Sequence, residues 1–223
     1  MITYKIHFIR HGLTQANKDG RYIGRTDTPL CTEGMDELRS LKETYAYPKV
    51  QKVYTSPLLR CRQTAEILYP DHWTQVVEGF MEYDFGEFEG KTLADLKDDE
   101  NFKKWLTSGL KTTLPGGENG EDFLRRIVLG LSGVFEDMMK NKLTSVAVVT
   151  HGGVISSLLA GAGVPKREAM DYAVDNGRGF TIVMTPQMWM RDRCFEVFDV
   201  APKGERIGSN VGAFDQFITL EEK

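Results

Sequence analysis

The 223 residues suffice for one full-sized domain, and 41% hydrophobic with 27% charged residues is typical of a globular protein, which excludes a disordered, collagenous or small disulfide-bonded chain. The net charge of −4 argues against a surface that binds nucleic acid or an anionic membrane. Three widely separated cysteines predict neither a disulfide framework nor a zinc site. The sequence shows no signal-peptide pattern and no apolar run of about 18 residues, so we expect a cytoplasmic protein without a membrane anchor.

Strands and helices are predicted in alternation through the first third of the chain. The β-branched and aromatic residues at 4–9 predict a strand that ends at Arg10, and the apolar spacing over 31–45 predicts a helix. A second strand is expected over 50–55. Pro57 then stands at a favoured first helical position and opens the next helix.

The second half of the chain has the same alternation. Asn119 is a candidate N-cap for a helix whose apolar residues recur every three or four positions from Phe123 to Met138. The near-continuous apolar run at 145–150 predicts a strand that is covered on both faces. The remaining expected elements are a small apolar helix over 154–161 and strands over 180–185 and 194–200.

Residues 82–118 do not fit this alternation. The segment is acidic, has short helical pieces between Leu93 and Leu106, and ends in the turn sequence PGG, so we expect an excursion that crosses the active-site edge of the sheet. The alternating strands and helices outside this segment predict one domain of the α/β class over 1–223. We expect a three-layer α/β/α sandwich with a mostly parallel central sheet. The polar tail from Lys203 onward predicts no clear element.

Cationic and imidazole side chains follow three of the predicted strands. Arg10 and His11 end the first strand, Arg60 lies one turn into the helix after the second, and His151 ends the strand at 145–150. The carboxyl ends of parallel strands meet at one edge of the sheet, where helix N-termini also offer backbone N–H groups to anions. Two guanidinium groups and two imidazoles at one edge predict a site for a tetrahedral dianion such as phosphate.

These residue types also indicate a reaction. A neutral imidazole is a competent nucleophile toward phosphorus, and a phosphohistidine divides one difficult transfer into two easier ones. The leaving alkoxide then needs a proton from a carboxyl group that stays neutral near pH 7. Glu82 is the candidate, because it lies in a cluster with Asp84, Glu87 and Glu89, where like charges oppose ionisation.

At these residues the sequence resembles the histidine phosphatase superfamily, the phosphoglycerate mutase-like proteins. The similar motifs occur in family order and cover about residues 4–160: RHGLTQAN at 10–17, RYIGRTDTPLCTEG at 21–34, SPLLRCRQTAEIL at 56–68, EYDFGEFEG at 82–90, PGGE at 115–118 and THGGVI at 150–155. The resemblance implies a phosphoglycerate mutase-like fold. It also implies that neither a metal nor a cofactor takes part in the transfer step.

The resemblance assigns roles to individual residues. It implies that His11 accepts the phosphoryl group and that Arg10, Arg60 and His151 form a charged cage around it. Asn17 and the backbone at Gly152 complete the phosphate contacts. Glu82 falls at the family's acid/base position, with Glu87 and Glu89 as the alternatives. The loop residues Arg21 and Gly24 are further candidates for binding the substrate.

Hydrolysis is favoured over mutase activity. The interval from Glu82 to Gly116 is short, whereas the mutases resemble one another in a longer insertion, and FGEFEG with KTLADL is more similar to the phosphatase branch. We therefore predict a metal-independent phosphomonoester hydrolase that acts on a small phosphorylated metabolite through phosphohistidine. The alternatives are a cofactor-dependent phosphoglycerate mutase-type transfer, a non-catalytic phosphate-binding protein, and an acyl hydrolase with Ser56 as nucleophile and His151 as base. The sequence does not indicate an oligomeric state.

Two further histidines have less specific interpretations. His7 lies four residues before His11 in the middle of the predicted strand, and we expect a packed or hydrogen-bonded side chain there. His72 follows Pro70 and Asp71, so we expect it in a loop.

Overall fold

The computed structural model of the protein describes residues 2–108 and 112–204. Its strands form one seven-stranded sheet in the order β3-β2-β4-β1-β6-β7-β5. The strands are β1 (Tyr4–Arg10), β2 (Lys52–Thr55), β3 (Thr74–Val76), β4 (Ser145–Thr150), β5 (Gly163–Val164), β6 (Gly179–Met184) and β7 (Phe195–Ala201). Most of the polar tail predicted to lack an element, residues 205–223, lies outside the described residues.

The sheet is mostly parallel, as predicted. Strands β3, β2, β4 and β1 pair in parallel, and β5 pairs in parallel with β7. Only β6 runs against its two neighbours in the described part of the chain. The apolar strand β4 lies between β1 and β2 and is buried on both faces from Val146 to Thr150, which explains why its sequence does not alternate.

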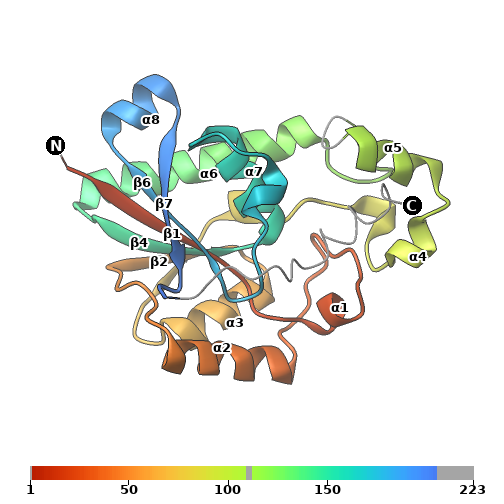
Figure 1. Ribbon diagram of the computed structural model, residues 1–223, viewed down its shortest axis with the longest axis horizontal. Helices are drawn as coiled ribbons and strands as arrows, with labels where there is room; N and C mark the ends of the chain where they lie inside the picture. Colours follow the sequence, from red (N-terminus) through yellow and green to blue (C-terminus); the bar gives the residue numbers. More distant parts are fainter. Residues whose placement is uncertain (1, 109–111, 205–223) are drawn as a thin grey trace.

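Eight α-helices cover the sheet and its edges in the described residues. They are α1 (Gln15–Lys18), α2 (Thr32–Thr44), α3 (Leu59–Leu68), α4 (Leu93–Leu96), α5 (Glu100–Ser108), α6 (Gly120–Asn141), α7 (Gly152–Ala162) and α8 (Pro186–Asp192). Helices α2 and α3 lie on one side of the sheet, and α6 and α7 lie on the other (Figure 1). The predicted three-layer α/β/α sandwich is therefore confirmed. None of the described helices is both long enough and apolar enough to span a bilayer.

The core lies in two clusters, one on each face of the sheet. Alternate residues of a strand point to opposite faces, so β1 places Phe8 in the cluster under α6 and α7, and Ile9 in the cluster against α2 and α3. Fully burying one such side chain contributes about 1.5–3 kcal/mol. The two clusters together hold the central strands between the helical layers.

The predicted helix starts are correct in one case and displaced in another. Asn119 caps α6 as predicted, because its Oδ1 accepts the backbone N–H groups of Glu121 and Asp122 at 2.7 and 3.0 Å. Pro57, in contrast, is not the first helical residue: α3 begins at Leu59. The N–H of Leu59 donates at 2.7 Å to Asp27, a residue of a distant loop, so the position of this helix start depends on tertiary structure.

The excursion at 82–118 carries α4 and α5 and, in its described part, no β-strand. Its aromatic side chains pack on one another, with Phe85 and Phe102 each against Trp105 at ring-centroid distances of 5.7 and 5.9 Å. Tyr83 joins this group to the main core through Phe123, at 5.4 Å. Aromatic packing therefore fixes the excursion against the end of α6.

Candidate active site

The convergence predicted from the strand ends occurs in the structure. Because β2, β4 and β1 are adjacent and parallel, the residues that follow them lie side by side: the N–H of His11 donates to Thr150 O at 2.8 Å, and the N–H of Ser56 donates to Val149 O at 3.0 Å. The rings of His11 and His151 come within 5.3 Å of each other, centroid to centroid. Residues 140 positions apart in the sequence thus face each other across one edge of the sheet.

His11 has a defined tautomer. Its Nδ1 lies 2.7 Å from the backbone carbonyl of Gly12, and a carbonyl only accepts, so Nδ1 carries the proton and Nε2 carries the lone pair. Burial, followed by the nearby Arg60 and Arg10 guanidinium groups, holds the pKa of His11 well below its ordinary value. The imidazole is therefore neutral at pH 7, as a nucleophile must be.

His151 is the N-cap residue of α7 and is completely buried. Its Nε2 lies 2.8 Å from the hydroxyl of Ser56 and 3.5 Å from the thiol of Cys61. Burial, with Arg60 and His11 as the next causes, holds the pKa of His151 well below its ordinary value. Both histidines of the site are thus neutral before an anion binds.

Arg10 contributes a charged group with spare donors. Its Nη1 donates to Val174 O at 2.7 Å, whereas its buried Nε has no hydrogen-bond partner in the described part of the chain. An unsatisfied buried donor is costly unless a ligand uses it. The backbone at Gly152 approaches this group so closely that an added Cβ would lie 3.5 Å from Nε. An anion bound here can contact Arg10 and the start of α7 together.

Arg60 is the most deeply buried cation of the site, with 1% of its surface exposed. Its Nη1 and Nη2 donate to the carbonyls of Thr26 and Gly24 at 2.9 and 2.6 Å. These bonds use two of the five N–H donors of a guanidinium, and the described residues supply no other hydrogen-bond acceptor to it. Its charge lowers the pKa of both His11 and His151, so it acts on both imidazoles.

Glu82 lies beside the N-terminus of α7. Its Oε2 accepts the N–H of Gly153 at 3.0 Å, and its Oε1 accepts the N–H of Tyr83 at 2.9 Å. Burial raises the pKa of Glu82, and these backbone donors together with Arg60 and Arg126 oppose the rise. The raised pKa agrees with the sequence prediction, but the expected cause was wrong: removal from water raises it, not repulsion from neighbouring carboxylates.

The three remaining candidates have other partners in the structure. Asn17 belongs to the capping box of α1, and its Oδ1 accepts the N–H of Thr14 at 3.2 Å. The guanidinium of Arg21 donates to Gly90 O at 2.7 Å and lies 3.5 Å from Asp19. The N–H of Gly24 donates to Glu89 at 2.8 Å. Gly24 therefore contacts the site through its carbonyl, which accepts a hydrogen bond from Arg60.

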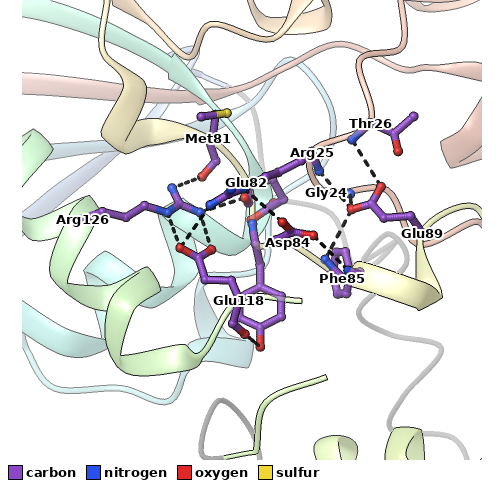
Figure 2. Close-up of polar contacts among 12 residues, drawn as sticks. Gly24, Arg25, Thr26, Met81, Glu82, Asp84, Phe85, Glu89, Glu118 and Arg126 are labelled. Carbon is purple, nitrogen blue, oxygen red and sulfur yellow. Dashed lines mark hydrogen bonds and ion pairs between the residues drawn. The ribbon is translucent and has the colours of Figure 1, made fainter. Parts of the chain in front are cut away.

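Sequence reasoning missed Arg126, which holds the segment that carries Glu82. Its guanidinium donates to both carboxylate oxygens of Glu118 at 2.7 and 2.8 Å and to the carbonyls of Met81 and Glu82 at 2.6 and 2.8 Å (Figure 2). It also donates to the carbonyl of Gly79 at 3.0 Å. In the sequence, Arg126 stands beside the exposed Arg125 in a helix. The helical spacing alone distinguishes the two, because Arg126 falls next to the buried stripe that includes Phe123 and Ile127.

The profile of the histidine phosphatase superfamily, branch 1, matches residues 6–194. The chain belongs to the histidine phosphatase superfamily. It is 30% identical over 178 residues to the adenosylcobalamin/alpha-ribazole phosphatase of Escherichia coli, with 78% of this chain and 86% of that protein covered. Together with the family match, this similarity identifies the chain as a phosphatase of the superfamily, as the sequence motifs predicted.

Solved structures of the superfamily share its fold. The alpha-ribazole phosphatase from Shigella flexneri superposes with a TM-score of 0.75 at 24% identity, covering 88% of this chain and 95% of that one. The phosphoglycerate mutase from Bacillus anthracis superposes with a TM-score of 0.74 at 21% identity, covering 89% and 92%. The fold is therefore phosphoglycerate mutase-like.

The described residues contain no group of three or more His, Cys, Asp or Glu side chains that could hold a metal ion. His7 and His72 lie outside the site. His7 is buried and hydrogen-bonded, as predicted, with Nδ1 at 2.8 Å from Thr181 Oγ1 and Nε2 at 3.2 Å from Ser145 Oγ. His72 contacts Val50 O at 2.9 Å.

Proposed function

We propose that this phosphatase hydrolyses a small phosphomonoester through a phosphohistidine on His11. The observation that carries the proposal is the pair of neutral imidazoles, 5.3 Å apart, under the influence of two arginines. One guanidinium, that of Arg10, has a buried N–H without a protein partner. A tetrahedral dianion fits this combination of donors and charge.

In the first step, Nε2 of His11 attacks phosphorus and the bond to the leaving oxygen breaks. Charge on the phosphoryl oxygens is stabilised by Arg10, Arg60 and His151. At about 4 Å and an effective dielectric constant of about 20, each cation supplies about 4 kcal/mol of gross attraction before desolvation costs. The alkoxide that leaves takes the proton of Glu82, whose raised pKa keeps this carboxyl protonated to higher pH than usual.

In the second step, water attacks the phosphorus of phosphohistidine. Glu82, now ionised, takes a proton from this water, the P–N bond breaks, and inorganic phosphate leaves with His11 restored. The N–H groups of Tyr83 and Gly153 stabilise the carboxylate during the interval between the steps. Glu82 thus alternates between acid and base, while Asn17 and Gly152 complete the contacts to the phosphoryl oxygens.

The charges beside the site favour hydrolysis over transfer between two phosphorylated positions. Transfer of the mutase type needs cations for a second phosphate, yet Arg21 is paired with Asp19 at 3.5 Å, and Arg25 lies 3.5 Å from Asp84 and 3.4 Å from Glu118. A second anionic group would have to displace these carboxylates.

The name of the Escherichia coli relative makes alpha-ribazole phosphate one substrate to test. The three free cysteines favour a reducing, cytoplasmic setting.

The test is phosphate release from an aryl phosphate in the presence of a chelator. The wild type should turn over, and His11→Ala should lose all activity above background. His7→Ala is the matched control, because it removes a buried histidine that belongs to β1, the strand that His11 follows, and that lies outside the site. Robust turnover by His11→Ala contradicts the mechanism. Isomerisation of a sugar phosphate without net phosphate release supports the mutase alternative. Tight phosphate binding without turnover supports a non-catalytic protein.

The acyl-hydrolase alternative is not favoured by the family. The Ser56–His151 contact of 2.8 Å has the geometry of a nucleophile with its base. In the proposed mechanism, the same contact orients His151 toward the phosphoryl group. Resistance of the enzyme to a fluorophosphonate probe is the expected result, and covalent labelling of Ser56 would restore the alternative.

A further inference from the structure

The carboxylate of Glu89 is bound by the backbone of two segments of the chain. Its Oε1 accepts the N–H groups of Gly24, Arg25 and Phe85 at 2.8, 3.0 and 3.3 Å, and its Oε2 accepts the N–H of Thr26 at 3.3 Å (Figure 2). Four converging N–H groups form an anion-binding concavity of the kind that holds phosphate or carboxylate. Here the anion is a side chain of the excursion, and it ties the excursion to the loop at 24–26.

The other side of the same loop binds Arg60. The carbonyls of Gly24 and Thr26 accept the two Nη groups of the guanidinium at 2.6 and 2.9 Å. The loop therefore lies between a carboxylate, which takes its N–H groups, and a guanidinium, which takes its carbonyls. The Glu89 carboxylate orients the peptide groups so that their carbonyls point toward Arg60, and the Arg60 guanidinium orients the same groups so that their N–H groups point toward Glu89.

Close packing leaves this loop little freedom. A Cβ added at Gly24 would lie 1.7 Å from the backbone oxygen of Tyr83 and 2.7 Å from Oε1 of Glu89. No side chain fits between the loop and the excursion, so the backbone of Gly24 lies directly on it. Only the backbone of the loop at 24–26 thus separates Glu89 from Arg60.

We propose that Glu89 is a positioning residue, which holds the loop at 24–26 so that Gly24 O and Thr26 O aim the Arg60 guanidinium at the phosphoryl group. This inference rests on the proposed role of Arg60 in phosphate binding. We assign Glu89 no role in proton transfer, because its hydrogen bonds go to the N–H groups of the loop, whereas the carbonyls of that loop bind Arg60. It acts on turnover through Arg60, whose misplacement by a fraction of an ångström weakens a charge-assisted bond to the transition state.

A double-mutant cycle tests the inference. We compare wild type, Glu89→Ala, Arg60→Ala and the double variant in two measurements: kcat/KM for an aryl phosphate, and the dissociation constant for inorganic phosphate. Glu100→Gln is the control from the same excursion, since Glu100 is an exposed residue of α5. Circular dichroism and thermal melting show that each variant is folded. If Glu89→Ala or Arg60→Ala does not fold, Glu89→Gln or Arg60→Lys, which keep one acceptor or the charge, takes its place in the cycle.

We expect Glu89→Ala to lower kcat/KM by about tenfold or more, as the loss of one charge-assisted interaction does, and to weaken phosphate binding in parallel. In the Arg60→Ala background the same substitution should change either quantity by less than about twofold, because the group through which it acts is absent. Glu100→Gln should behave like wild type. Equal losses in both backgrounds, or no loss in the wild-type background, overturn the inference.

The two measurements separate this inference from the proposed function. If the wild type binds phosphate but releases none from any ester, the proposed function fails, and the cycle on phosphate binding still decides the role of Glu89. If turnover is normal and the two losses add, the function stands and the inference fails. If the wild type neither turns over nor binds phosphate, both fail.

Discussion

Replacement of Arg126 by alanine tests how much the clamp on the Glu82 segment contributes to stability. The substitution removes five hydrogen bonds, two to Glu118 and three to backbone carbonyls. It also leaves the carboxylate of Glu118, whose side chain is 8% exposed, without its bidentate partner. The segment from Gly79 to Glu82 then loses its hydrogen bonds to the side chain of residue 126.

The size of the effect follows from the burial of the pair. Removing one partner of a buried ion pair costs about 3–5 kcal/mol of unfolding free energy. Two observations place Arg126→Ala at the low end, about 3 kcal/mol: the Arg126 side chain is 19% exposed, and Nη2 of Arg25 stays 3.4 Å from Glu118.

Arg125→Ala is the matched control. Arg125 precedes Arg126 on the same helix, is 69% exposed and lies 3.2 Å from Asp122, a surface pair worth about 0.5 kcal/mol or less. Urea unfolding followed by tryptophan fluorescence gives the midpoint and slope for each variant. The reasoning is refuted if the two variants lose equal stability, or if Arg126→Ala loses less than about 1 kcal/mol, the range of surface pairs.

The remaining predictions concern Glu82 and the cap of α6. Glu82→Gln should lower kcat by about 10²–10⁴, the usual contribution of a general acid, and abolish the fall in turnover that the wild type shows as pH rises through the raised pKa of Glu82. Because the folded state binds this proton more tightly than the unfolded chain, the stability that Glu82 contributes is fully present below its ordinary pKa of 4.5 and is lost as pH rises to its folded pKa. The urea midpoint of Glu82→Gln should therefore lack the pH-dependent part that Glu82 contributes to the wild type. An identical pH dependence of the midpoint in wild type and Glu82→Gln would count against a raised pKa. Asn119→Ala should cost about 1 kcal/mol through loss of the N-cap, measured by the same urea titration; a loss no larger than that of Asn141→Ala, at the opposite end of the helix, would show that the cap contributes little.

The convergence of Arg10, His11 and His151 was predictable from the sequence because it depends on strand topology. A strand pattern followed by Arg10 and His11, and another followed by His151, determine which edge these groups occupy once the strands are parallel and adjacent. Arg60 follows from its place near the start of the helix that succeeds β2. No side-chain detail is needed for this step, since the carboxyl ends of adjacent parallel strands always lie together.

The supporting contacts could not be predicted in this way. Glu89 and Arg126 bind backbone groups of segments 24–26 and 79–82, and no periodicity in the sequence relates either side chain to the distant segment that it binds. The displaced start of α3 has the same origin, because Asp27 caps it from another loop. The raised pKa of Glu82 was expected for the wrong reason, since burial depends on tertiary packing that acidic composition does not reveal.

The insertion of β4 between β1 and β2 determines when the enzyme gains activity during synthesis. Strands β1 and β2 leave the ribosome early but do not pair with each other; each pairs with β4, which emerges some 90 residues after β2. A nascent chain that ends before Ser145 therefore has both arginines and the first histidine but lacks β4, the strand with which β1 and β2 pair. Catalytic competence should arise abruptly with this late, long-range pairing, which also predicts slow folding relative to proteins of local topology.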